Sequence, residues 1–151
     1  MKPTIALLLL ILAVTIAPAA ERMQTDVFTA GTNGYGVYRI PGMIVTPKGA
    51  LLAYAEARKT TGSDWDAIDI VTRRSEDKGK TWSNLQVVGK LKGPIEKNPA
   101  GPQRRLSGPS DAITYNNPIA ISDTKKNLIH FLFCTEYMRA FYMRSTDDGK
   151  T

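Results

Sequence analysis

From residue 37 onward, the chain alternates short apolar stretches with clusters of Gly, Pro, Asp and Ser. The stretches are rich in β-branched and aromatic residues, which is typical of strands. Pro41-Gly42 is expected to end the first strand, and Pro47-Lys48-Gly49 to form a hairpin turn. No segment after the N-terminus has convincing helical periodicity, so the pattern predicts an all-β protein at sandwich, barrel or propeller spacing. The predicted strands are residues 37–40, 43–46, 50–55, 68–74, 85–88, 119–121, 128–135 and 140–144.

A long stretch rich in Pro and Gly interrupts this pattern between Lys92 and Ser110. Its composition predicts a loop with no element of its own. Loops of this length are often functional. It is therefore expected either to overhang a binding site or to be a tolerated surface insertion.

The N-terminus has the features of an export signal. Lys2 precedes an apolar run from Thr4 to Ala17, and Ala17-Pro18-Ala19 is a small-residue cleavage pattern. The run is shorter than the ~20 residues of a membrane span. Residues 1–19 are therefore predicted to be a signal peptide, leaving a secreted or periplasmic protein without a membrane span after cleavage.

A repeated turn motif decides between the all-β architectures. Ser75-Glu76-Asp77-Lys78-Gly79-Lys80-Thr81-Trp82 has a near copy in Ser145-Thr146-Asp147-Asp148-Gly149-Lys150-Thr151. Both fit S-x-D-x-G-x-T, and each follows a strand that ends in Arg-Ser. The Ser and Asp side chains can fix a tight turn, and Gly supplies a positive φ. Copies after matched strands indicate a repeat fold, most simply a β-propeller, of which this length holds about two blades.

The composition limits the classes of partner and of metal site that the chain could have. The chain has 20 Lys and Arg against 14 Asp and Glu, a formal charge of +6. This balance suits nucleic acid, a membrane surface or an anionic small substrate. The basic residues are spread along the chain, which argues against a nucleic-acid partner. The single cysteine and the single histidine exclude an intrachain disulfide framework and make a thiolate or histidine metal site unlikely, so no metal and no cofactor are predicted.

Three segments carry residues suited to binding an anion and transferring a proton. Arg39, within Tyr38-Arg39-Ile40-Pro41, can hold a carboxylate with its planar fork, or else pair with a structural acid. Arg58 stands where a strand passes into a loop, where binding residues collect. Asp64 and Asp66 flank Trp65 in that loop, and a carboxyl group beside an indole can serve as a general acid. Ordinary turn acids remain the alternative for both aspartates.

The order of these motifs resembles the start of the exo-α-sialidases (neuraminidases) of bacterial and animal type, whose repeated turns are called Asp boxes. The likeness covers about Gly36 to Thr151 and reaches the second predicted blade through Asn117-Pro118 and the turn at Ser145. The resemblance implies a six-bladed propeller with its site on the axis. Residues 20–151 would then form the N-terminal, truncated part of that domain, about its first two blades.

The resemblance also implies roles for single residues. Arg39 matches the first of three arginines that hold the sialic acid carboxylate, and Asp64 matches the acid/base aspartate, with Asp66 as the other candidate. Arg58 matches an arginine near the 4-hydroxyl, and Asn117 matches a pocket position often occupied by Asp or Asn. Sialidases use a tyrosine nucleophile, activated by a glutamate. The resemblance places that pair and the other two arginines in later blades, so the fragment alone is expected to be inactive.

Two functions remain open at this point. The resemblance implies a secreted, retaining exo-α-sialidase that removes terminal sialic acid from sialylated glycans or glycoconjugates. The alternative is a non-catalytic propeller of the same ancestry that binds glycans or a protein partner. Tyr137 could line the pocket, although a structural role is favoured. His130 and Cys134, in an apolar strand, are expected to be core residues.

Overall fold

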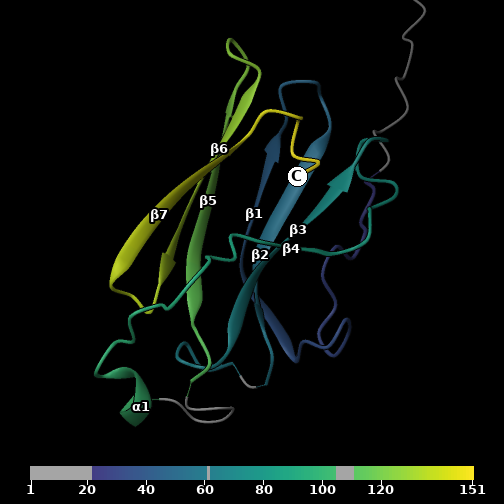
Figure 1. The fold of residues 1–151 in the computed structure, drawn as a ribbon. Coiled ribbons are helices and arrows are strands. Elements are labelled where there is room, and N and C mark those ends of the chain that lie inside the picture. The colour runs from purple at the N-terminus through teal and green to yellow at the C-terminus, as the bar shows by residue number, and fades with distance from the viewer. Residues whose placement is uncertain (1–21, 61, 105–110) are drawn as a thin grey trace, which may run out of the picture.

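The computed structural model describes residues 22–60, 62–104 and 111–151, and these form two antiparallel sheets (Figure 1). The first sheet has the order β1-β2-β3-β4, and the second has the order β5-β6-β7. The predicted signal peptide lies outside the described residues. Among the helices of the described part, none is long and apolar enough to cross a membrane. The strands are β1 (Val37–Val45), β2 (Leu51–Arg58), β3 (Ile68–Ser75), β4 (Gln86–Val88), β5 (Tyr115–Asp123), β6 (Leu128–Thr135) and β7 (Arg139–Ser145).

Pro41-Gly42 does not end the first strand, contrary to the prediction. The segment is one strand, β1, with a register shift between Arg39 and Gly42. Pro41 has no N–H to donate, and such residues are tolerated on edge strands and at bulges. Ile40 takes a positive φ of 52° there. At Gly42 a Cβ would lie 2.2 Å from the Tyr54 ring, so the strand passes the ring only because that position has no side chain.

The main core lies between the two sheets. Leu52, Tyr54 and Ile70 of the first sheet pack against Phe131 and Phe133 of the second, with further members Tyr115, Ala120 and Ile129. Tyr54 meets Phe131 edge to face at 5.5 Å between ring centroids. A smaller cluster covers the other face of the first sheet and contains Tyr35, Ala55, Ala57 and Val71. The alternation along β2 therefore directs its larger apolar side chains at the second sheet and its alanines away from it.

The two predicted turns have the same internal hydrogen bonds. The Ser75 hydroxyl donates to Asp77 at 2.8 Å, and Ser145 donates to Asp147 at 2.6 Å. The Gly79 and Gly149 amides donate to those serines at 2.8 and 2.9 Å. In each turn the closing threonine, Thr81 or Thr151, donates its amide and hydroxyl to the aspartate. The repeat seen in the sequence is thus a repeat in structure.

The second turn also joins the two sheets through Asp148. This buried carboxylate accepts hydrogen bonds from the Thr46 hydroxyl at 2.9 Å, the Lys48 amide at 3.0 Å and Arg74 Nη2 at 2.6 Å. Burial alone would raise the pKa of Asp148, but these three donors lower it on balance. The corresponding position of the first turn is Lys78, so only the second copy has this inter-sheet clasp.

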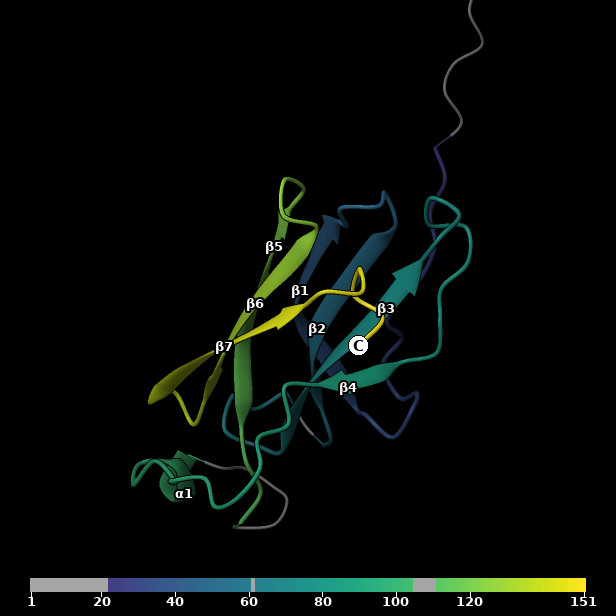
Figure 2. The same cartoon turned by 45° about the horizontal axis from the view of Figure 1, so that its top comes forward.

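The long loop contains one short element that the sequence did not predict. It is the single-turn helix α1 (Gly101–Arg104). Figure 1 places α1 at the end of the molecule where β2 finishes and β5 begins, and Figure 2 shows the same arrangement from another side. The two repeated turns and the C-terminus lie at the opposite end. The loop therefore extends beside the end of the sheets that carries the candidate residues.

His130 and Cys134 are not core residues, contrary to the prediction. Both are half-buried on the outer face of the second sheet, where His130 Nδ1 lies 2.9 Å from the Tyr142 hydroxyl. The alternation of β6 directs Phe131 and Phe133 toward the first sheet, so the residues between them face outward. The sequence did not distinguish the two faces of β6, because the outer face of the sheet is also apolar. Its exposed residues include Ile119, Ile121, Leu132 and Tyr142.

Candidate functional site

Two matching bulges lie at the same end of the two sheets. Tyr38-Arg39-Ile40-Pro41 in β1 and Tyr115-Asn116-Asn117-Pro118 in β5 each contain a register shift. Ile40 and Asn117 occupy equivalent places and have nearly equal positive φ values, 52° and 53°. β5 therefore begins before the predicted residue 119. The internal match between the two tetrapeptides is a signal in the sequence that we missed.

Arg58 is a buried cation at this end. It is the last residue of β2, and its side chain is 1% exposed. Its Nη2 lies 2.7 Å from Glu56 Oε2, and its Nη1 lies 2.7 Å from Asp64 Oδ1. Burial alone would lower the pKa of the Arg58 guanidinium, but the hydrogen bonds to Glu56 and Asp64 raise it on balance. Arg58 is thus a fixed cation.

Arg39 and Arg58 converge on the same loop. Arg39 Nη1 lies 3.2 Å from Asp64 Oδ1, the oxygen that Arg58 also contacts. Both arginines also donate to the Gly62 carbonyl oxygen. The Arg39 and Asp64 side chains remain 48% and 55% exposed. The structure therefore brings together three of the four predicted residues as an open, solvent-accessible constellation with one acidic group between two cations.

The structure distinguishes the two candidate aspartates. Asp66 is fully buried, and its carboxylate accepts a hydrogen bond from the Thr60 hydroxyl at 2.9 Å. Its backbone carbonyl also accepts from the Thr114 hydroxyl at 2.8 Å, which ties the loop to the segment before β5. Asp64 instead faces solvent and the two arginines. Of the two, Asp64 is the carboxylate that a substrate could reach.

The fourth predicted residue, Asn117, is connected to the others through Glu56. The Glu56 carboxylate is fully buried and accepts a hydrogen bond from the Asn117 amide at 2.8 Å through Oε1, while Oε2 holds Arg58. Glu56 of β2 therefore links Arg58 to the bulge of β5. Glu56 was not among the residues predicted from the sequence. A glutamate between two alanines in an otherwise buried strand was the available signal, because a buried carboxylate needs a charged or hydrogen-bonding partner.

Three loops meet on Trp65, next to Asp64. The Trp65 ring lies 4.8 Å from that of Tyr137, which belongs to the loop between β6 and β7. The Arg104 guanidinium lies 5.5 Å from the Trp65 ring centroid on the side of α1. Burial raises the pKa of Tyr137; the nearby Asn116 side chain opposes this, while the charges of Glu56 and Asp64 add to it. Tyr137 thus lies within electrostatic reach of the arginine and aspartate cluster.

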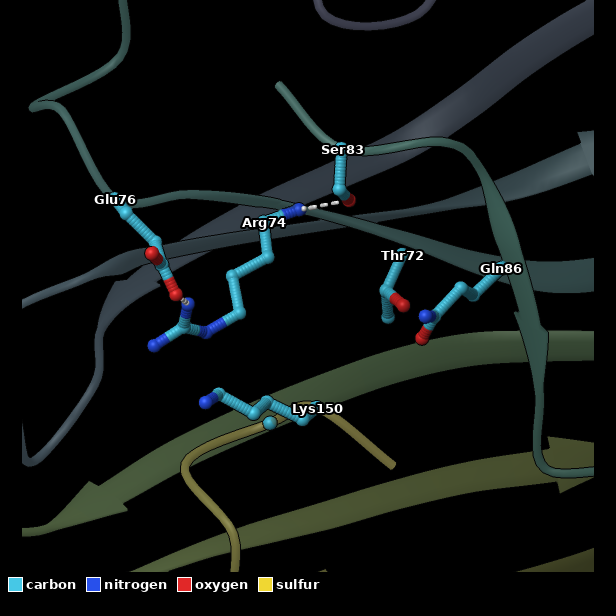
Figure 3. Close-up of a pocket in the computed structure, with 7 residues that line it drawn as sticks. Thr72, Arg74, Glu76, Ser83, Gln86 and Lys150 are labelled. Atoms are coloured by element: carbon cyan, nitrogen blue, oxygen red, sulfur yellow. Dashed lines mark hydrogen bonds and ion pairs between the residues drawn. The ribbon is translucent and has the colours of Figure 1, made fainter. Parts of the chain in front are cut away.

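A separate hollow lies at the opposite end of the sheets (Figure 3). This cavity of about 220 Å³ is lined by Arg74, Glu76 and Lys150, together with Thr72, Ser83, Gln86 and Gly149. Its arginine is already paired with Glu76 and Asp148. Arg74 is six residues along β3 from Ile68, or about 20 Å at the usual rise per residue. The hollow is therefore not part of the constellation around Asp64.

Within the described residues, no group of three or more His, Cys, Asp or Glu side chains is arranged to hold a metal ion. The groups available for chemistry at the candidate site are the carboxylate of Asp64, the two guanidinium groups and the polar side chains beside them. Such a set can bind an anion and transfer a proton.

Comparison with known proteins shows which proteins this chain is similar to. No family model matches the chain. A curated sialidase from Micromonospora viridifaciens is 39% identical over 85 residues, which cover 54% of this chain and 13% of that protein. A sialidase from Bacteroides fragilis (strain YCH46) is 29% identical over 152 residues, covering 87% of this chain and 26% of that protein. The chain is thus similar to curated sialidases over most of its length.

Solved sialidase structures share the fold of this chain. The leech intramolecular trans-sialidase superposes with a TM-score of 0.57 at 22% identity, covering 76% of this chain and 18% of that one. The intramolecular trans-sialidase of Ruminococcus gnavus gives 0.55 at 22% identity, covering 72% and 23%. The NanB sialidase of Streptococcus pneumoniae gives 0.56 at 24% identity, covering 72% and 17%. The predicted fold class, an all-β protein built as part of a β-propeller, is confirmed.

The chain spans about one eighth and one quarter of the lengths of the two curated sialidases it matches. The activity, substrates and partners of the whole protein are therefore matters for proposal.

Proposed function

We propose that this chain supplies the acid/base carboxylate and part of the carboxylate-binding site of a secreted or periplasmic exo-α-sialidase. The protein would hydrolyse terminal sialic acid from glycoconjugates with retention of configuration. The observation that carries the proposal is the exposed Asp64 carboxylate between Arg39 and Arg58, at 3.2 and 2.7 Å from their guanidinium nitrogens. Relatives that bear the name sialidase support the assignment of substrate class.

Substrate binding would begin at the exposed guanidinium. Arg39 is half exposed and pairs with Asp64 on one side, so its remaining N–H groups can receive the substrate carboxylate. A bidentate guanidinium–carboxylate pair is both strong and geometrically specific. Arg58 is fixed by the buried Glu56, so it acts as a rigid support for Asp64 and for the polar side of the sugar. Asn117, held by Glu56 through its backbone, would present its amide to the same sugar.

Asp64 would carry the proton. In the first step its carboxyl group protonates the glycosidic oxygen as the aglycone leaves, and in the second its carboxylate takes a proton from the attacking water. The sialic acid carboxylate would repel a carboxylate nucleophile, and sialidases use a tyrosine instead. We assign that tyrosine, its glutamate partner and the two further arginines to parts of the protein outside this chain. The 151-residue chain alone is then expected to bind weakly and not to turn over.

The complete protein that carries this chain tests the proposal. It is expected to release the fluorophore from a 4-methylumbelliferyl α-sialoside, with α-sialic acid as the first product seen by NMR. Sialoside binding without any release would instead support the non-catalytic glycan-binding propeller. For export, N-terminal sequencing of the secreted protein is expected to start at Ala20; a retained Met1 would contradict the signal peptide.

A further inference from the structure

The loop of residues 92–104 is anchored from within the molecule. The Glu136 carboxylate is fully buried and accepts hydrogen bonds from Lys97 Nζ at 3.1 Å, the Asn98 amide at 3.3 Å and the Thr114 amide at 2.9 Å. The Asn98 side chain also donates to the Glu136 backbone carbonyl at 2.9 Å. A buried carboxylate with this many donors fixes its partners, because breaking any contact leaves an uncompensated charge. The loop is therefore a built part of this end of the molecule.

This anchoring places α1 against Trp65. Gly101 begins the helix and is buried. A Cβ added at Gly101 would lie 3.5 Å from both Glu136 Oε2 and Trp65 Cε3. One turn later, Arg104 holds its guanidinium 5.5 Å from the Trp65 ring centroid. An aromatic face orients a guanidinium by cation–π attraction while leaving its N–H groups available. Arg104 forms no ion pair with any described residue, and its side chain is exposed.

Arg104 is therefore a preoriented cation beside the acid/base residue. Trp65 directly follows Asp64, so the indole and the carboxyl group leave neighbouring Cα atoms about 3.8 Å apart. A general acid touches the oxygen of the leaving group, so the leaving group must lie beside Asp64. The carboxylate of the sialic acid being released is assigned to Arg39, which contacts Asp64 at 3.2 Å. A leaving group beside Asp64 would then lie within reach of the long Arg104 side chain on the neighbouring Trp65.

We propose that Arg104, stacked on Trp65, forms a leaving-group subsite that recognises the carboxylate of a second sialic acid. The substrate class would be a sialoside whose leaving group is itself sialylated, such as an α2,8-linked disialic acid. A guanidinium fork matches such a carboxylate, whereas a neutral galactose offers it no charge. This inference rests on the proposed function, since it presupposes that the first sialic acid binds at Arg39.

The test is binding of two sialosides to the 151-residue chain. The indole N–H resonance of Trp65, assigned with a Trp82→Phe variant, is followed by NMR at low salt with α2,8-disialic acid and with 3′-sialyllactose. Arg104→Gln is expected to weaken disialic acid binding about five- to tenfold, as loss of one charge-assisted contact does, and to change sialyllactose binding less than about twofold. Arg139→Gln is the matched control: it removes one positive charge from the same end, where Arg139 pairs with Glu96 away from Trp65.

The possible outcomes distinguish failure of the Arg104 subsite from failure of the proposed function. Loss of binding of both ligands in Arg39→Ala would show that both bind through Arg39. If Arg104→Gln then weakens the binding of both ligands equally, or of neither, the subsite is wrong and the proposed function stands. If Arg139→Gln has the same effect as Arg104→Gln, general electrostatics explains the preference and the subsite is again overturned. If neither ligand binds even at millimolar concentration, sialic acid recognition by this chain fails, and the subsite fails with it.

Discussion

Glu56 and Asn117 are 61 residues apart in the chain and are joined by a hydrogen bond of 2.8 Å between the buried carboxylate and the Asn117 amide. The same carboxylate holds Arg58 at 2.7 Å. One buried side chain of β2 therefore links the first sheet to the bulge of β5 and fixes the cation that supports Asp64.

Removal of this carboxylate is expected to destabilise the chain. Glu56→Ala leaves Arg58 buried without its main partner, and breaking a buried pair in this way costs about 3–5 kcal/mol. Glu56→Gln, which keeps the shape and an acceptor, is expected to cost less. Urea unfolding of both variants measures the effect. Glu76→Ala is the control, because Glu76 is 72% exposed; if Glu56→Ala costs no more than this control, the linking role is wrong.

The roles of the two loop aspartates can be separated by mutation. Asp64→Ala is expected to lower the sialidase activity of the complete protein by ~10²-fold or more, the scale of general acid loss, and to lower its melting temperature less than Asp66→Asn does. Asp66→Asn is expected to lower the melting temperature while keeping much of the activity, because Asp66 is buried against Thr60. The opposite pattern would transfer the acid/base role to Asp66.

Arg39→Lys tests whether this side chain holds the substrate carboxylate. Lysine keeps the charge but not the planar fork. The variant is expected to raise KM by about tenfold or more, since a hydrogen bond to a charged group contributes about 1.5–3 kcal/mol. Steady-state kinetics on the complete protein measures this. Arg144→Lys, on an exposed position of β7, serves as the matched control and should leave KM unchanged.

The clasp at Asp148 should contribute to stability and not to chemistry. Asp148→Ala leaves the partly buried Arg74 with only Glu76 as an ionic partner, so a loss of about 3–5 kcal/mol is expected. Differential scanning calorimetry of the chain measures it. Lys78→Ala changes the equivalent position of the first turn, which makes no such contact, and should leave the melting temperature nearly unchanged. Equal effects of the two substitutions would refute the clasp.

The repeated turns predict an acid-sensitive part of the stability. Hydrogen bonds from Thr81 and Ser75 lower the pKa of Asp77 from its ordinary 3.8 to about 2. The pKa of Asp147 is also lowered, chiefly by Ser145 and Thr151. A lowered folded-state pKa gives stability that is present above pH 3.8 and is lost as the pH falls toward 2.

Asp77→Asn should therefore flatten the fall of the melting temperature between about pH 4 and pH 2. The exposed Asp26→Asn is the control for simple charge removal. An unchanged slope in Asp77→Asn, matching that of the control, would show that the turn carboxylates do not contribute in this way.

Much of the fold could be predicted because its signals are local. The β1–β2 hairpin follows from Pro47-Lys48-Gly49, and the paired turns follow from residue types that bond within four positions. The break predicted at Pro41-Gly42 was wrong because a bulge accommodates proline where no ladder hydrogen bond is needed. That requirement depends on which strand lies alongside, which local sequence does not report.

Some residues of the candidate site could likewise be predicted from local motifs, and others could not. Arg39, Arg58 and Asp64 were selected from motif order, and the structure brings them into contact. Glu56 and Glu136 were missed because each has a partner far away in the chain: Asn117 is 61 residues from Glu56, and Asn98 is 38 residues from Glu136. α1 was missed because four residues are too few for a periodic pattern, and its position depends on the buried carboxylate of Glu136.

The central claim is that Asp64 protonates the leaving group, and leaving-group dependence tests it most directly. Activity of Asp64→Ala is compared with that of the unaltered complete protein on 3′-sialyllactose and on α-sialyl fluoride, whose fluoride leaves without a proton. The account predicts a loss of ~10²-fold or more on sialyllactose and a far smaller loss on the fluoride. An equal loss on both substrates would contradict it, because Asp64 would then act in positioning or binding and not in proton transfer.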